Sequence, residues 1–219
     1  KVGVYKKLVI YENKIIGIVL YGDTADASWY LKLLKEHTDI SDLRTKILFG
    51  KSALSGDAGH GGKDAGAVNR NGTEAGYNLI VAKIVKKNLE AKGFKVIMTR
   101  ETNVYLSLQQ RVSLANRYQD AIFVSIHFNA SSRTSASGIE TFTLSPKGVA
   151  HYGRSVKRSD HQTRQGNYQD SANIALASAI HSRMIVRTKA AKVEDRGIKR
   201  ARFSVLSSIK LPAILVEGG

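Results

Sequence analysis

The first residues of this chain that could do chemistry are a histidine in a glycine-rich run and two later residues of metal-ligand type. His60 lies in the run of residues 57–66, and Glu74 begins a helical pattern. His127 ends the apolar run of residues 121–126. Two histidines and one carboxylate are a known ligand set for catalytic zinc, which keeps a fourth position open for water. The three residues therefore predict a zinc site.

A second glutamate could act beside that metal. Glu217 ends the apolar run of residues 213–216, and a carboxylate near zinc can serve as the general base. Taken singly, each of the four residues has an ordinary alternative. His60 could be a surface turn residue, His127 a hydrogen-bonded core histidine, Glu74 a first-turn acid and Glu217 part of a frayed end. All four alternatives would have to hold at once, at matching strand ends.

Several further residues could support this site. Asp57 and Asn129 are candidates to accept the second N–H of a zinc-bound histidine, although Asp57 could equally be a turn residue. Arg100 and Arg111 could pair with buried acids or with substrate carboxylates, and we favour structural roles for both. Residues 195–197 fit a plain turn or the rim of the site. The remaining histidines have no supporting context and are interpreted as bystanders: His37, His151, His161 and His181.

Composition restricts the class of protein. A chain of 219 residues with 42% hydrophobic residues can hold one ordinary domain and a small appendage. It has no apolar run of 18 residues, so no membrane span is predicted, and no cysteine, which excludes disulfides and thiolate zinc sites. The net charge of +16 favours an anionic polymer as partner, namely nucleic acid, lipid headgroups or an acidic cell wall, and a basic surface that serves only solubility is the alternative. The chain shows neither a signal peptide nor an initial Met, which indicates a processed product or a fragment.

The start of the chain predicts a small ββα segment. Two β-rich runs, residues 7–11 and 15–21, flank Glu12-Asn13-Lys14 and suggest a hairpin. Residues 27–35 follow with a helical pattern that Asp26 or Thr24 could cap.

From residue 57 onward strands and helices alternate, which predicts an α/β fold with a mostly parallel sheet flanked by helices. In such sheets ligands bind at the carboxyl ends of the strands, where His60, His127 and Glu217 fall. Residues 145–169 lack apolar periodicity and are interpreted as a long mobile loop, a lid or substrate rim. The predicted helices are residues 74–92, 106–118 and 172–185, and the predicted strands are residues 94–98, 121–126, 139–144, 203–206 and 213–216.

The motifs of residues 57–219 resemble those of the zinc-dependent N-acetylmuramoyl-L-alanine amidases, bacterial cell-wall hydrolases with a twisted sheet flanked by helices. The matching pieces, in family order, are Asp57 to Gly66, Glu74, Thr99-Arg100, Leu108 to Arg111, Ala115-Asn116, Ser125 to Ala130, Gly138 to Thr141, Asp195 to Lys199 and Pro212 to Glu217. The resemblance implies that His60, Glu74 and His127 bind zinc and that Glu217 is the catalytic glutamate.

The chain departs from that family at three places. Ala58 stands where the family usually has proline. Residues 51–56 replace an apolar first strand with poor strand material. The family normally continues past the catalytic glutamate, so the chain, which stops at Gly219, is predicted to be truncated at its C-terminus.

Residues 2–54 carry a second resemblance, to the end of the flavin reductase part of nitrite reductase large subunits. The matching residues include Val4 to Ile10, Gly22 to Asp26, Trp29-Tyr30, Asp39 to Arg44 and Leu48 to Gly50. No dinucleotide-binding glycine motif and no cluster cysteines accompany them, so we expect no redox activity. A coincidental ββα unit is the alternative. The predicted domains are thus residues 1–54, the small segment, and residues 55–219, the catalytic domain.

Together these observations predict hydrolysis of the amide between N-acetylmuramic acid and L-alanine of the peptidoglycan stem peptide. The alternatives are a non-catalytic fusion remnant and a basic protein that binds an anionic polymer. Peptidoglycan is the expected partner, and no specific nucleic acid is expected. The resemblance implies a place in the cell envelope, periplasmic or extracellular. The oligomeric state does not follow from the sequence.

Overall fold

The computed structural model describes residues 5–22, 24, 26–43, 47, 53–92, 94–118, 121–129 and 137–218. The chain divides into two compact units, Lys1–Ser52 and Ala53–Gly219, and each is described by itself. Each unit has its own hydrophobic core.

The first unit is a β-hairpin packed against one helix. Strands β1 (Tyr5–Tyr11) and β2 (Lys14–Tyr21) pair antiparallel around Glu12 and Asn13, whose φ angles are 44° and 58°. Two successive residues at positive φ match the twist of a tight hairpin. Helix α1 (Ala27–Lys35) and a 3₁₀ turn (Ser41–Leu43) follow. The predicted ββα order is confirmed, although the side chain of Asp26, at the N-cap, makes no capping hydrogen bond.

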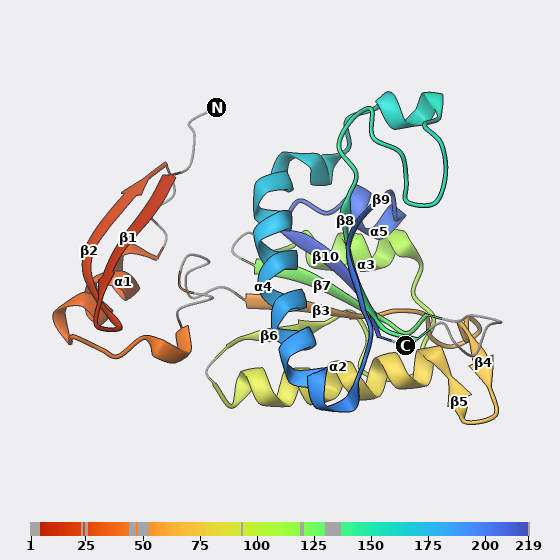
Figure 1. Ribbon diagram of the computed structural model, residues 1–219, viewed down its shortest axis with the longest axis horizontal. Coiled ribbons are helices and arrows are strands. Elements are labelled where there is room, and N and C mark those ends of the chain that lie inside the picture. Colours follow the sequence, from red (N-terminus) through yellow and green to blue (C-terminus); the bar gives the residue numbers. More distant parts are fainter. Residues whose placement is uncertain are drawn as a thin grey trace. The chain divides into compact units, whose positions relative to one another are not determined.

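The second unit is built on a six-stranded sheet in the order β6-β3-β7-β10-β8-β9 (Figure 1). Its neighbours are parallel except β8 and β10, so the predicted mostly parallel sheet is confirmed. The strands are β3 (Ala53–Ala58), β6 (Val96–Met98), β7 (Ala121–His127), β8 (Ile139–Leu144), β9 (Asp195–Ala201) and β10 (Ala213–Gly218). A two-residue pair, β4 (Val68–Asn69) and β5 (Gly72–Thr73), stands apart from this sheet.

Helices cover both faces of the sheet. Helices α2 (Glu74–Glu90) and α4 (Asp170–Thr188) pack on one face, and α3 (Leu108–Ala115) and the short α5 (Ser204–Ser207) pack on the other. Two N-termini are capped by side chains. Thr73 accepts a hydrogen bond from Gly76 N, and Ser107 forms a capping box with Gln110. Three 3₁₀ turns complete the unit: Arg158–His161, Gln165–Gln169 and Lys189–Ala191.

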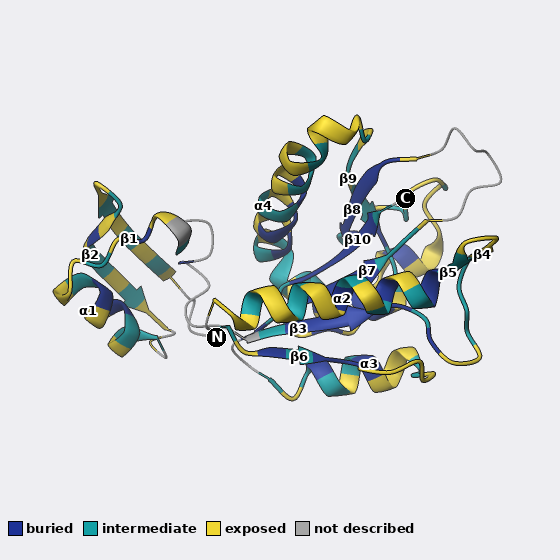
Figure 2. Ribbon diagram, turned by 90° about the horizontal axis from the view of Figure 1, so that it is seen from below, coloured by how far each residue is buried: buried dark blue, intermediate teal, exposed yellow. Residues whose placement is uncertain are grey.

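Along the central strands, successive core side chains alternate between the two faces of the sheet. Phe123 and Leu215 belong to the cluster that includes residues of α3 and α5, whereas Val124 and Val216 belong to the cluster of α2 and α4. Both faces of a parallel sheet are buried, which explains the nearly continuous apolar runs. Figure 2 shows the central strands of the sheet as largely buried and the outer sides of the helices as exposed. Glu217 and His127 fall in register on the same face as Leu215 and Phe123.

Two predictions of local structure are wrong. Residues 51–56 looked like poor strand material, yet β3 begins at Ala53 and pairs with β6 and β7 on its two edges. Pairing on both sides outweighs the weak propensity of Ser55 and Gly56. Residues 203–206 form the start of α5 rather than a strand. An apolar run of four residues is too short to distinguish the periodicity of a helix from that of a strand.

The long loop of residues 145–169 lies at the edge of the sheet opposite Glu217. Ser145 N donates to Ala201 O, at the carboxyl ends of β8 and β9. Strand β8 runs antiparallel to β10, and β9 is parallel to β8. The carboxyl ends of β8 and β9 therefore lie at the opposite end of the sheet from the carboxyl end of β10. The expectation of a lid or rim over the predicted zinc site is therefore wrong in its placement.

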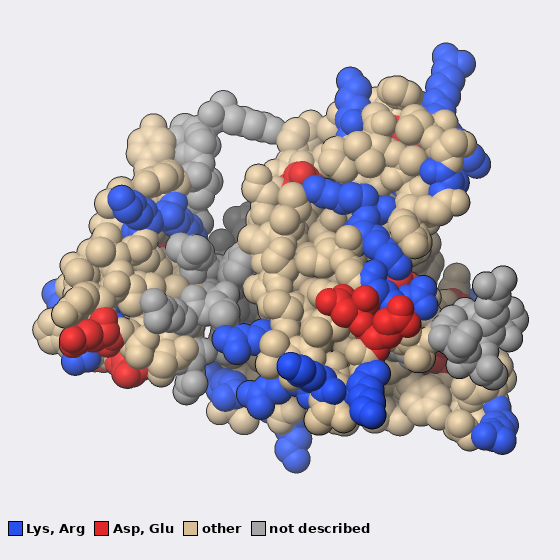
Figure 3. All heavy atoms as spheres, viewed as in Figure 1, with Lys and Arg blue, Asp and Glu red and all other residues tan. Residues whose placement is uncertain are grey.

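Basic side chains are spread over the second unit on the face drawn in Figure 3, while Asp and Glu gather in a small patch. Among the described residues no helix is both long and apolar enough to cross a bilayer.

Candidate metal centre

Three strand ends and one helix start bring the candidate ligands to one edge of the sheet. His127 is the last residue of β7, and Glu217 lies beside it in register on β10. His60 follows the end of β3, the other neighbour of β7, and Glu74 is the first residue of α2. Because β3, β7 and β10 are parallel, their carboxyl ends share an edge, as predicted for a ligand site.

His60, Glu74 and His127 converge on one point. Glu74 Oε1 lies 3.2 Å from His60 Nε2 and 3.0 Å from His127 Nδ1. The imidazole rings meet edge to face, with centroids 5.0 Å apart. One donor atom from each side chain lies within 4.8 Å of the others, as in a cluster that could hold a metal ion.

The second oxygen and the surroundings of Glu74 fix its position. Ala67 N donates to Glu74 Oε2 at 3.0 Å, and Phe128 N lies 3.3 Å from Oε1. Burial alone would raise the pKa of Glu74, but the hydrogen bonds from His127 and His60 hold that pKa well below its usual range. The Glu74 bond in turn raises the pKa of His60 to about 9, against the effect of burial. In the cluster the negative charge of the Glu74 carboxylate is thus stabilised by hydrogen bonds from the two imidazole rings. A bound cation would change this arrangement of charge.

Asp64, rather than Asp57, orients the ring of His60. His60 Nδ1 lies 2.9 Å from Asp64 Oδ2, which leaves Nε2 toward Glu74. Asp57, a candidate for such a partner or equally for a turn residue, is neither. Asp57 lies within β3, and the side chains of Thr99, Arg111 and Ser125 donate hydrogen bonds to its carboxylate oxygens.

Two glycines leave room for the cluster. A Cβ on Gly59 would lie 2.3 Å from His127 Nε2, and a Cβ on Gly66 would lie 2.6 Å from Glu74 Oε2 and 2.8 Å from His60 Cδ2. Gly66 also has a φ of +63°, which side chains rarely adopt. The site is therefore a cradle that any side chain at these two positions would fill.

Glu217 stands at the cluster with a free oxygen. Its residue is 8% exposed, and among the described residues its buried Oε2 has no hydrogen-bond partner. Burial, together with the nearby charges of Glu74 and Glu140, raises the pKa of Glu217 to about 8. A buried carboxyl group without a partner is costly, and such groups cluster at functional sites.

Glu140 is the neighbour of Glu217 on the next strand. It is buried and is held by Lys199, by Arg196 Nε at 3.3 Å and by the side-chain amide of Asn129. Asn129 thus contacts a carboxylate and not, among the described residues, a histidine of the cluster. Residues 195–197, predicted as a turn or rim, belong to β9 and bring Arg196 to Glu140.

Arg100 and Arg111 donate hydrogen bonds to the loop that carries His60, in agreement with the structural roles predicted for them. Arg100 donates to the carbonyls of Ala58, Gly59 and Ala75 at 2.7–2.9 Å. Arg111 forms a buried ion pair with Asp57 at 2.7 Å and donates to His60 O.

Two of the histidines interpreted as bystanders have structural partners. His181 is buried between Thr141 Oγ1, at 3.0 Å, and Asp195 Oδ1, at 2.8 Å. His151 Nδ1 accepts from Arg202 N at 2.9 Å. The sequence interpretation missed Asp64 as the partner of His60, although the spacing of four residues within one loop is a usable signal.

Comparison with known proteins identifies the family of the second unit. A family model described as N-acetylmuramoyl-L-alanine amidase matches residues 57–219. The chain belongs to this amidase family. Its resemblance to the family, stated from the motifs, is thereby confirmed.

Relatives within the family include AmiA, an N-acetylmuramoyl-L-alanine amidase of Escherichia coli. It is 30% identical over 206 residues, which cover 85% of this chain and 71% of AmiA. LytC, an amidase of Bacillus subtilis, is 32% identical over 161 residues, which cover 74% of this chain but 28% of LytC. The crystal structure of an N-acetylmuramoyl-L-alanine amidase from Clostridium difficile superposes with a TM-score of 0.59 at 30% identity, covering 75% of this chain and 77% of that one.

The start of the chain has a separate and weak match. A model described as rubredoxin NAD+ reductase C-terminal domain matches residues 1–38. This overlaps the segment that resembles part of a nitrite reductase, and it does not assign a function to it.

Proposed function

We propose that this chain is a zinc-dependent N-acetylmuramoyl-L-alanine amidase of the bacterial cell envelope, acting in the periplasm or outside the cell. It would hydrolyse the amide that joins N-acetylmuramic acid to L-alanine of the peptidoglycan stem peptide. The observation that carries the proposal is the convergence of His60, Glu74 and His127 near Glu217, whose buried Oε2 has no hydrogen-bond partner among the described residues.

The residues present fit zinc. Two imidazole nitrogens and one carboxylate oxygen form a donor set that zinc accepts, and the glycine cradle keeps the space between them free of side chains. Asp64 fixes the ring of His60 so that Nε2 faces the shared point, as an outer hydrogen-bond partner of a ligating histidine does. Zinc, when bound, would polarise the scissile carbonyl and make water easier to deprotonate.

Glu217 would carry the proton transfers. Its buried Oε2 is free to accept a proton from the attacking water and then to return it to the leaving amine of L-alanine. A carboxyl group whose pKa lies near neutral pH is suited to both steps, because it changes its protonation state at little cost. Glu140 lies beside it on β8 and is occupied by Lys199 and Arg196, so Glu217 is the carboxyl group left available.

The test combines metal content with product chemistry. Wild type should bind one zinc per chain and release wall fragments with new L-alanine amino termini but no new reducing ends. Glu217→Gln should keep the zinc and lose turnover by at least about a hundredfold. His127→Ala should lose both.

The matched control is His161→Ala, which removes an exposed histidine in the 3₁₀ turn far from the site. It should keep zinc and activity. Full activity in Glu217→Gln would contradict its role as base. Zinc retained at wild-type affinity in His127→Ala would contradict the ligand assignment.

A further inference from the structure

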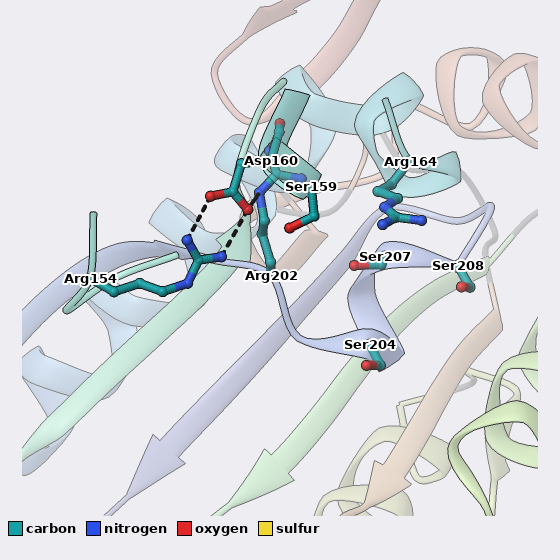
Figure 4. A pocket seen from close by; sticks show the side chains of 8 residues that line it. All are labelled: Arg154, Ser159, Asp160, Arg164, Arg202, Ser204, Ser207 and Ser208. Carbon is teal, nitrogen blue, oxygen red and sulfur yellow. Dashed lines mark hydrogen bonds and ion pairs between the residues drawn. The ribbon is translucent and has the colours of Figure 1, made fainter. Parts of the chain in front are cut away.

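A second polar cavity lies at the opposite edge of the sheet from the metal centre. It has a volume of about 320 Å³ and lies between the loop after β8 and the segment that leaves β9 (Figure 4). Its walls carry three arginines, one aspartate and four serines: Arg154, Arg164, Arg202, Asp160, Ser159, Ser204, Ser207 and Ser208.

The single carboxylate in this cavity is fully occupied by its neighbours. Asp160 is buried, and Arg154 binds it with two hydrogen bonds of 2.6 and 2.8 Å. Lys157 N donates to it at 2.8 Å, and Arg202 Nε lies 3.1 Å away. The Arg154 guanidinium holds the pKa of Asp160 well below its usual range, so the carboxylate stays charged. Three cations against one anion leave the cavity with a net positive charge.

Two of the arginines retain unused donors. The side chain of Arg202 is 9% exposed, and its Nη1 is buried without a hydrogen-bond partner among the described residues. The other nitrogens of Arg202 are fixed by the carbonyls of Val149, Pro146 and Asp160. No carboxylate of the described chain pairs with Arg164, whose guanidinium points toward Ser207 in Figure 4.

Unmet guanidinium donors and serine hydroxyls around one space have a specific chemical complement. Tetrahedral oxyanions accept several hydrogen bonds at once, and arginine is the side chain best matched to phosphate. A buried donor without an acceptor is unfavourable, and a ligand oxygen near Arg202 Nη1 would relieve it.

We propose that this cavity is a binding site for a phosphate group, separate from the metal centre. Arg202 is held in place by Asp160 and by backbone carbonyls, so the site is preformed. Arg164 supplies a second, unpaired charge, and Ser204 of α5 supplies a hydroxyl donor, whereas the hydroxyl of Ser207 donates to Phe203 O and can only accept. The volume exceeds that of a single phosphate and leaves room for a group esterified to it.

The test is calorimetric titration of the full chain with sodium phosphate at constant ionic strength, with dimethyl phosphate as a minimal phosphodiester. Saturable binding of either probe is the expected result. Binding of dimethyl phosphate would indicate a phosphodiester polymer as the source, and binding of inorganic phosphate alone would indicate a free phosphate or a monoester. Binding of neither overturns the proposal.

Two matched variants decide whether the binding belongs to this cavity. Arg164→Gln should weaken the affinity roughly tenfold or more, because it removes a charge-assisted contact. Arg158→Gln removes an equal charge from an exposed position in the same loop, outside the cavity, and should leave the affinity unchanged. Equal losses in both would show attraction by overall charge and overturn the proposal.

His127→Ala separates this site from the metal centre. It should bind phosphate as wild type does, even though it is expected to lose zinc. Loss of phosphate binding in His127→Ala with retention in Arg164→Gln would place the anion at the metal centre and contradict the cavity. Arg164→Gln should also keep amidase activity on wall fragments.

Discussion

A comparison of alanine substitutions at Gly66 and at Gly148 separates the effect of backbone strain from the effect of packing in the metal centre. Gly66→Ala would place a methyl group 2.6 Å from Glu74 Oε2, so Glu74 or His60 must move. Gly148 has a similar positive φ, +80°, with nothing within 4 Å of an added Cβ. Both substitutions should cost about 1–2 kcal/mol of backbone energy. Only Gly66→Ala should also lose metal affinity and turnover.

Thermal unfolding and zinc content, measured on both variants, check this prediction. A loss of stability in both variants, larger in Gly66→Ala because of its contacts with Glu74 and His60, with loss of zinc in Gly66→Ala alone, is the expected pattern. Equal zinc content in the two variants would show that the cluster tolerates displacement and that Gly66 serves only the turn.

Glu217 gives the metal-free protein a specific pH dependence. Its pKa rises from 4.5 to about 8 in the folded chain because it is buried near Glu74 and Glu140. The folded state therefore holds this proton between those values while the unfolded state has released it. Since the folded state binds more protons there, stability falls as pH rises across that window.

Glu217→Gln should remove this contribution. In the presence of a chelator, the melting temperature of wild type should decline from pH 5 to pH 8, and Glu217→Gln should flatten the decline and melt higher at pH 8. Glu194→Gln, at an exposed position, is the control and should follow wild type. A parallel decline in Glu217→Gln and wild type would show that Glu217 titrates normally.

At the level of the elements, Arg100 connects β6 to the His60 loop and to the first turn of α2. Its contacts with the carbonyls of Ala58, Gly59 and Ala75 span the segments that carry two of the candidate ligands, His60 and Glu74. A lysine has one compact donor group and cannot reach all three carbonyls. Arg100→Lys should therefore lower the free energy of unfolding by about 2–4 kcal/mol, from the lost charge-assisted bonds.

Chemical denaturation and zinc titration would test this connection. Arg117→Lys, at an exposed position after α3, is the matched control and should change neither quantity. Arg100→Lys should weaken zinc binding as well as stability. A variant that lost stability but kept full zinc affinity would show that the loop holds its shape without Arg100.

The sequence allowed the elements with clear periodicity to be predicted, and with them the edge at which the ligands meet. Helix α2 and strand β7 are long enough for their periods to be distinct. Strand β9 was missed because its sequence, Asp195 to Ala201, is basic and contains glycine. It is held by pairing with β8 and by the contacts of Lys199 and Arg196 with Glu140, which depend on the tertiary fold.

The same distinction applies to the site. Residue type and position, at strand ends or at the start of α2, led to the candidates His60, Glu74, His127 and Glu217, and the structure brings the first three into one cluster. The partner of His60 was missed: the spacing of four residues within one loop points to Asp64, but the choice of Asp64 over Asp57 also depends on which way the chain turns after β3. Asp57 is held within β3, whereas His60 adopts a positive φ of 59° in the turn that follows, and Asp64 Oδ2 lies 2.9 Å from its Nδ1.

At the level of the whole molecule, the two units have separate cores. The core of the first consists of Ile15, Tyr30, Leu33, Ile40 and Ile47 and includes no residue of the second. All four candidate site residues, with Asp64 and Arg100, belong to the second unit. We propose that residues 55–219 are the catalytic domain and that residues 1–54 take no part in catalysis or redox chemistry.

Removal of residues 1–50 should therefore leave the amidase site intact. The shortened chain keeps all of β3, so the sheet and the His60 loop retain their contacts. It should bind zinc with wild-type affinity and release wall fragments at a rate within about twofold of the full chain, because the two units have separate cores and independent parts contribute additively. His127→Ala in the shortened chain should abolish both. Loss of zinc or of lysis in the shortened chain itself would show that the first unit stabilises the catalytic one, and a flavin absorbance band in the full chain would contradict the absence of redox chemistry.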